Sequence, residues 1–182
     1  MSGQGTVSGQ GAEGRRGRRH PFRVGVAALR ERHGGVMDVA RSGPIDGLEM
    51  PDSAVPEGRD VEVEARLEAA GEGVMVTADV RAPWEGTCRR CLGPASGLLC
   101  SRTREFYGDQ GDPELVYPLR GQQLDLELLA RDAILLGLPQ VPLCRPDCAG
   151  LCPTCGTDRN TGDCGCGERT GDPRWAALDQ LS

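Results

Sequence analysis

Lysine is absent from this sequence of 182 residues, so all 21 basic residues are arginines. We attribute this to the codon composition of a GC-rich genome, because no single site chemistry would exclude lysine from a whole surface. Aromatic residues make up only 3% of the chain, which predicts a modest core of aliphatic side chains. The 27 glycines and 13 prolines predict many turns.

Long apolar runs are also missing. No stretch approaches the roughly 18 apolar residues that a membrane-spanning helix needs. The N-terminal stretch MSGQGTVSGQGAEGRRGRRH has no apolar segment after its arginines, unlike a secretory signal. We therefore expect a cytoplasmic protein without a membrane partner.

Common catalytic motifs are missing as well. The sequence has no Gly-rich phosphate loop, no suggested Ser/His pair and no His-Glu zinc signature that leaves a coordination position open. A redox role for the Cys-Arg-Arg-Cys stretch is conceivable, because flanking arginines would lower a thiol pKa. It lacks the strand–helix–strand context of thioredoxin-like motifs, however. We therefore expect that the protein is not an enzyme.

The charge of the chain is unevenly distributed. Residues 1–33 carry seven arginines and two acidic residues, whereas the rest of the chain carries 14 arginines and 25 acidic residues. The net charge of −6 therefore combines a basic start with a strongly acidic remainder. An acidic folded part favours a basic protein partner over direct contact with RNA.

Residues 1–20 have almost nothing to bury, which predicts a disordered tail rich in Arg and Gly. Clustered arginines release counterions from RNA of any sequence. The tail is therefore either a solubilising extension or an RNA contact, and in the second case the contacting residues are Arg15, Arg16, Arg18 and Arg19.

The stretch VEVEARLEAAGEGVMVTADVRAPW predicts a β-hairpin. Apolar residues alternate with polar ones over 61–68 and again over 74–80, and Gly-Glu-Gly at 71–73 supplies the turn. Alternation with period two means that one face of this hairpin is buried. The buried positions are predicted to be Val61, Val63, Ala65, Leu67, Val74, Val76, Ala78 and Val80.

Other segments complete the expected fold. We expect strands over 22–29 and 97–107, a loop over 41–58, and an amphipathic helix within 124–139 that Pro139 ends. A short helix should begin at Asp172. The prediction is an α+β domain over 21–140, with an antiparallel, barrel-like sheet and one amphipathic helix, followed by a Cys-rich zinc-binding tail over 141–182.

Six of the nine cysteines fall between residues 144 and 166. In a reducing cytoplasm, clustered cysteines are more often metal ligands or redox-active thiols than disulfides. The Cys-Pro-Thr-Cys-Gly stretch at 152–156 is typical of a zinc knuckle, and a closed shell of four cysteines is structural, not catalytic. One short zinc ribbon would use Cys152, Cys155, Cys164 and Cys166.

Five cysteines lie outside that set, and four of them form two pairs that are close in sequence. We expect one zinc ion or two, and a second ion would be held by Cys88, Cys91, Cys144 and Cys148. In the alternative, Cys144 or Cys148 completes the ligands of the ribbon's zinc ion, and the pair at 88–91 binds no metal. Cys100 has no partner by spacing and is expected to be a small packed side chain.

Four stretches together resemble one bacterial family. These are CRRCL after a hairpin, the helix LDLELLARDAILLGLP, the segment PLCRPDCAGLCPTCGTDRNTGDCGC, and DPRWAAL. From about residue 22 to the end, the chain is similar to the YceD family, the large ribosomal RNA subunit accumulation proteins, in their cysteine-rich form. The family's asparagine-rich NLN stretch is replaced by Asp158-Arg159-Asn160, so only Asn160 is kept.

The resemblance implies a non-catalytic factor needed for normal accumulation of large-subunit ribosomal RNA. Its partner would be a ribosomal protein or a precursor of that RNA. The matching cysteines are the eight named above, excluding Cys100. Two other functions are also consistent with the sequence: a zinc–thiol redox sensor, and an acidic adaptor that binds a basic ribosomal protein. The sequence does not determine the oligomeric state.

Overall fold

The computed structural model describes residues 20–31, 34–110, 112 and 115–166. The expected disordered tail with Arg15, Arg16, Arg18 and Arg19 and the expected helix at Asp172 lie outside these residues, apart from His20 at the end of the tail. Within the described part of the chain, no helix is long and apolar enough to cross a membrane.

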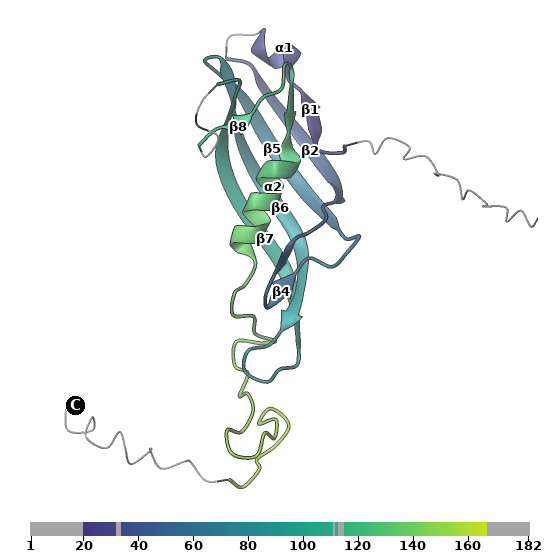
Figure 1. The fold of residues 1–182 in the computed structure, drawn as a ribbon, viewed down its shortest axis with the longest axis vertical. Helices are drawn as coiled ribbons and strands as arrows, with labels where there is room; N and C mark the ends of the chain where they lie inside the picture. The colour runs from purple at the N-terminus through teal and green to yellow at the C-terminus, as the bar shows by residue number, and fades with distance from the viewer. Residues whose placement is uncertain (1–19, 32–33, 111, 113–114, 167–182) are drawn as a thin grey trace, which may run out of the picture.

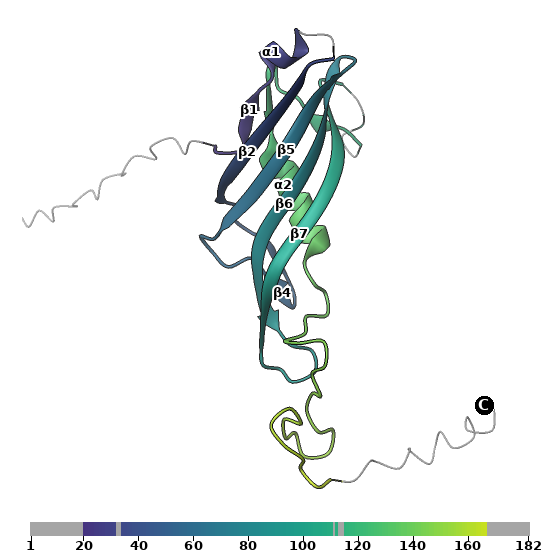
Figure 2. The ribbon, with the colours of Figure 1, turned by 180° about the vertical axis from the view of Figure 1, so that it is seen from behind.

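Four long antiparallel strands form the centre of the fold. They are β2 (Val36–Pro44), β5 (Asp60–Ala70), β6 (Gly73–Thr87) and β7 (Pro94–Gly108), and they lie side by side in this order. The short hairpin of β3 (Glu49–Met50) and β4 (Ser53–Ala54) pairs with the far end of β6, and β8 (Tyr117–Pro118) pairs with the end of β7. Figures 1 and 2 show the resulting long, twisted sheet.

The predicted hairpin is confirmed as β5 and β6. Its two-residue turn begins with Gly71 at φ +58, where glycine has no Cβ to clash with the backbone. All eight positions that the alternation assigns to the buried face are buried, from Val61 on β5 to Val80 on β6. The intervening polar residues face the other side of the sheet and are partly or fully exposed, as a half-buried sheet requires.

One helix covers the apolar face of the sheet. Helix α2 (Leu126–Gly137) begins at Asp125, whose side chain accepts a hydrogen bond from the Glu127 N–H at 3.0 Å. It ends before Pro139, as predicted. Figure 1 shows α2 lying across β6 and β7. The helix residues buried against the sheet are Leu126, Leu129, Ala130, Ala133 and Ile134.

The expected barrel-like closure is wrong, because the sheet is open. Among the described residues, β2 pairs only with β5, and the outer edge of β7 pairs only with the two residues of β8. A sheet closes into a barrel to bury one face inside. Here α2 and the small sheet of β1 (Arg23–Gly25) and β9 (Gln123–Asp125) cover that face instead.

Two other segments differ from the prediction. The expected strand over 22–29 divides into β1 and a single helical turn, α1 (Ala27–Arg30), because a turn is needed to bury Leu29 after Val26. The expected loop over 41–58 instead contains the end of β2 and the β3–β4 hairpin. Pro44 ends β2, which is an edge strand, so the N–H that proline lacks removes no hydrogen bond between strands.

Candidate metal centre

Cys88 and Cys91 lie in the turn that joins β6 to β7, at the end of the sheet away from α1 (Figure 1). The two strands pair continuously from Val74↔Tyr107 to Thr87↔Pro94, so this turn projects beyond the last paired residues. The chain leaves α2 in the same direction and brings residues 144–166 to this end of the sheet. Two segments far apart in sequence therefore meet here.

The structure brings Cys88, Cys91, Cys144 and Cys148 together. The Sγ atoms of Cys88 and Cys148 are 3.9 Å apart, and those of Cys91 and Cys144 are 3.7 Å apart. All four sulfurs lie within 4.8 Å of one another. Four sulfurs placed tetrahedrally at about 2.3 Å from one ion would be separated by about 3.8 Å, so this spacing suits a zinc ion.

A second group consists of Cys152, Cys155, Cys164 and Cys166, whose Sγ atoms also lie within 4.8 Å of one another. All nine cysteines are free thiols. We call these groups the first and second clusters. They are the two sets of four that the two-zinc interpretation names, whereas the alternative would place Cys144 or Cys148 with the second. That they hold metal stays a prediction.

The two Cys-x-x-Cys turns have the same backbone geometry. In the first, the Leu92 N–H donates to the Cys88 carbonyl at 2.9 Å, and in the second the Gly156 N–H donates to the Cys152 carbonyl at 2.9 Å. Both donors have positive φ, +58 at Leu92 and +76 at Gly156. Leucine rarely adopts this conformation, so the turn constrains the backbone of Leu92 strongly.

Backbone amides favour the thiolate form of one cysteine in each cluster. The N–H groups of Cys144 and Cys91 point at the Cys88 sulfur and lower its pKa to about 6. The N–H groups of Cys155 and Thr154 lower the pKa of Cys152 to about 6 in the same way. The pKa of Cys148 in the first cluster and of Cys155 in the second is lowered as well. A thiolate is the form of cysteine that ligates a metal, so each cluster has two cysteines prepared for binding.

Other thiols in the clusters have a raised pKa. Burial and the neighbouring Cys148 sulfur raise the pKa of Cys144 to about 12. The pKa of Cys166 also rises to about 12, mainly because of the sulfurs of Cys155 and Cys164. Several thiolates in one small space repel one another, and a divalent cation at the centre removes that repulsion.

Arg89 and Arg90 bind the two segments together, a role that the sequence interpretation missed. The Arg89 N–H donates to the Pro142 carbonyl at 3.0 Å, and the Arg90 carbonyl accepts from the Leu151 N–H at 3.0 Å. The Arg90 guanidinium donates to the carbonyl of Cys148 at 2.9 Å. The thiol pKa of Cys88 is lowered chiefly by backbone N–H groups, and neither arginine side chain is among its main causes.

Cys100 lies outside both clusters, on β7. The expectation that it is packed is wrong, because its side chain is exposed. It stands on the polar face of the sheet opposite Arg81, where no apolar layer covers it. Inward-facing neighbours such as Leu99 are buried, so the strand's alternation decides the exposure.

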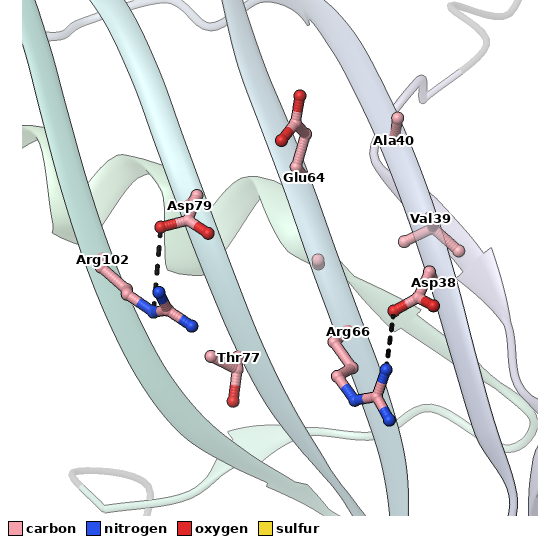
Figure 3. A pocket seen from close by; sticks show the side chains of 9 residues that line it. Asp38, Val39, Ala40, Glu64, Arg66, Thr77, Asp79 and Arg102 are labelled. Carbon is pink, nitrogen blue, oxygen red and sulfur yellow. Dashed lines mark ion pairs between the residues drawn. The ribbon is translucent and has the colours of Figure 1, made fainter.

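The polar face of the sheet contains a shallow hollow between β2 and β7 (Figure 3). Arg66 pairs with Asp38 at 3.5 Å and Arg102 with Asp79 at 3.9 Å. Exposed ion pairs of this kind contribute about 0–1 kcal/mol each. The charges in the hollow are matched across strands, which is typical of a solvated surface.

Comparisons with known proteins give one family and several relatives. A family model described as "Large ribosomal RNA subunit accumulation protein YceD" matches residues 76–182. An uncharacterized protein of Mycobacterium tuberculosis is 36% identical over 171 residues, covering 88% of this chain and 81% of that protein. One of Mycobacterium leprae is 28% identical over 171 residues, covering 88% and 77%.

A plant relative carries a more informative name. The "Large ribosomal RNA subunit accumulation protein YCED homolog 1, chloroplastic" of Zea mays is 38% identical over 66 residues, covering 34% of this chain and 22% of that protein. No solved structure matches the chain.

Proposed function

This chain belongs to the YceD family, and we propose that it is a non-catalytic ribosome-biogenesis factor that supports the accumulation of large-subunit ribosomal RNA. The observation that carries this proposal is the family match over residues 76–182, which spans both cysteine clusters. The absence of a typical catalytic motif in the sequence supports a binding role. We place the protein in the cytoplasm.

The cysteines supply the chemistry of this proposal. Each cluster would hold one zinc ion through four thiolates, the first with Cys88, Cys91, Cys144 and Cys148 and the second with Cys152, Cys155, Cys164 and Cys166. A shell of four cysteines leaves no coordination position for a substrate, so such an ion stabilises a fold. Zinc would supply folding free energy to a segment in which the structure has little apolar burial.

The partner that we propose is a basic ribosomal protein bound by the acidic folded part, or a precursor of the ribosomal RNA. The 25 acidic and 14 basic residues that follow residue 33 favour the basic protein, because opposite charges increase the rate of encounter. RNA contact would then depend on the arginines at 15, 16, 18 and 19.

The function is tested in cells that lack the gene. We expect the ratio of large-subunit to small-subunit ribosomal RNA to fall, and the wild-type protein to restore it. The variant Cys88→Ser/Cys91→Ser should not restore it, whereas Cys100→Ser should, because Cys100 belongs to neither cluster. An unchanged ratio after gene deletion would refute the proposal.

The metal is tested on the purified protein under reducing conditions. Elemental analysis should find two equivalents of zinc per chain in the wild-type protein and in Cys100→Ser, and one in Cys88→Ser/Cys91→Ser. Less than half an equivalent of any metal in the wild-type protein would contradict the assignment. Iron in place of zinc would appear as visible absorbance.

A further inference from the structure

Asn160 belongs to the second cluster in sequence but contacts the first in space. It lies in the loop between Cys155 and Cys164, and its Nδ2 donates to the Cys148 Sγ at 3.4 Å. Its Oδ1 accepts hydrogen bonds from the Ala149 N–H at 2.8 Å and from the Arg145 guanidinium at 2.7 Å. One side chain from the second cluster's loop therefore bonds to three residues of the 145–149 stretch.

The loop holds Asn160 in this position. Asp158 Oδ1 accepts from both the backbone N–H of Asn160, at 2.9 Å, and its side-chain amide. Backbone bonds fix the loop from both sides: the Cys152 N–H donates to the Thr157 carbonyl at 2.8 Å, and the Arg159 N–H donates to the Gly150 carbonyl at 2.9 Å. Both bonds lie within residues 150–159, the stretch that also carries Cys152 and Cys155 of the second cluster, so an ion held by these two cysteines would anchor the same loop.

An amide N–H aimed at a ligating sulfur stabilises the negative charge on that sulfur and fixes its orientation. Such outer contacts to metal ligands typically change metal affinity about 10–100-fold. Among the described residues, Asn160 is the side chain outside the two clusters that donates a hydrogen bond to a sulfur of the first. The contact therefore links the state of one cluster to the affinity of the other.

We propose that Asn160 couples the two clusters, so that metal binding at the second raises the metal affinity of the first. This rests on the proposed zinc binding. Closing the second cluster around its ion orders the loop and places Asn160 against Cys148. By thermodynamic linkage, metal in the first cluster raises the affinity of the second by the same factor.

The experiment is a double-mutant cycle read by competition with a chromophoric zinc chelator. Cys152→Ser/Cys155→Ser disables the second cluster and leaves the first as the remaining site, while Cys88→Ser/Cys91→Ser leaves the second, whose affinity should fall by the same factor. Disabling the second cluster should weaken zinc binding at the first about 10-fold or more. Asn160→Ala should weaken it similarly, and combining the two changes should add little.

Two further variants separate the donated hydrogen bond from general loosening of the loop. Asn160→Asp keeps an oxygen for Arg145 and Ala149 but has no N–H for Cys148. It also loses the bond to Asp158 and adds a negative charge beside the sulfur, so it should weaken the first cluster at least as much as Asn160→Ala does. Thr161→Ala removes the bond from Thr161 Oγ1 to the Asp158 carbonyl, 2.9 Å long, without touching a sulfur. It should leave the first cluster close to wild type.

Each outcome has a distinct meaning. Two zinc ions with independent affinities, wild-type affinity in Asn160→Asp, or an equal loss in Thr161→Ala would overturn the coupling and leave the proposed function intact. A wild-type protein that binds no zinc would instead refute the proposed metal sites. The cobalt-substituted protein gives a second measure, because its sulfur-to-cobalt absorption reports the first cluster directly in Cys152→Ser/Cys155→Ser.

Discussion

Leu92 shows how strongly the Cys-x-x-Cys turns constrain the backbone of single residues. It occupies the same place after Cys88 as Gly156 does after Cys152, with the same backbone hydrogen bond and a positive φ. For a residue with a Cβ, this conformation costs about 1–2 kcal/mol. The Leu92 side chain is 66% exposed, so its burial offsets little of this conformational cost.

We expect Leu92→Gly to tighten zinc binding at the first cluster about two- to five-fold. Glycine relieves the strain but has more backbone freedom to lose, which leaves a gain of about 0.5–1 kcal/mol. Gly156→Ala should weaken the second cluster by a similar two- to five-fold, since it introduces the strain but removes the extra backbone freedom that glycine loses. Chelator competition measures both. A weaker first cluster in Leu92→Gly would mean that the leucine side chain makes a stabilising contact.

Much of the site can be predicted from the spacing of the cysteines, but not the bonds between the clusters. The two thiols of each Cys-x-x-Cys pair lie together because the turn between them is short, and this is visible in the sequence. The contact of Asn160 with Cys148 joins residues 12 apart through a folded loop. Arg90 similarly bonds to residues nearly 60 positions away. Neither has a local pattern.

At the level of elements, the stability of the fold depends on the contact between α2 and the sheet. Ile134 of α2 is fully buried in the same core as the apolar residues of β5 and β6. Leu136, two positions later on the same helix, is 87% exposed. The two residues therefore provide a matched pair of substitutions in one element.

We expect Ile134→Ala to lower the free energy of unfolding by about 2–5 kcal/mol, because it leaves a cavity under the helix. Leu136→Ala should change it by less than about 0.5 kcal/mol. Urea unfolding of the zinc-loaded proteins, followed by circular dichroism, measures both. Equal effects of the two substitutions would mean that α2 does not pack as the structure places it.

The elements with a clear period of apolar residues could be predicted from the sequence. The elements that form only by pairing with a neighbouring strand could not. The alternation of β5 and β6 and the three-to-four spacing of α2 are local signals. Strand β2 has a weaker pattern and becomes a strand through its register with β5, from Val36↔Glu68 to Pro44↔Asp60. Whether a sheet closes or stays open depends on what covers its apolar face. That coverage depends on long-range packing.

At the scale of the whole molecule, the first cluster lies where the sheet meets the segment after α2, beside the bonds made by Arg89 and Arg90. Cys91 and Cys144 are 53 residues apart in sequence, with sulfurs 3.7 Å apart. If a zinc ion joins them, it closes a long loop. A cross-link of this span is worth roughly 4 kcal/mol, and a metal bridge follows the same reasoning only approximately. That is a large share of a stability of about 5–15 kcal/mol.

Cys91→Ser should therefore open the loop and loosen the segment after α2 as well as the β6–β7 turn. We expect zinc content to fall from two equivalents to one, because three thiolates hold zinc weakly while the second cluster keeps its four. The amide hydrogens that join the two segments, on Arg89 and Leu151, should then exchange faster. Trypsin should also cleave sooner after Arg90, in the loosened β6–β7 turn, whereas Cys100→Ser should match the wild type in both assays. If Cys91→Ser kept two zinc ions and resisted trypsin, the sheet and the cysteine segment would not share a metal, and a single centre within 144–166 would be the correct arrangement.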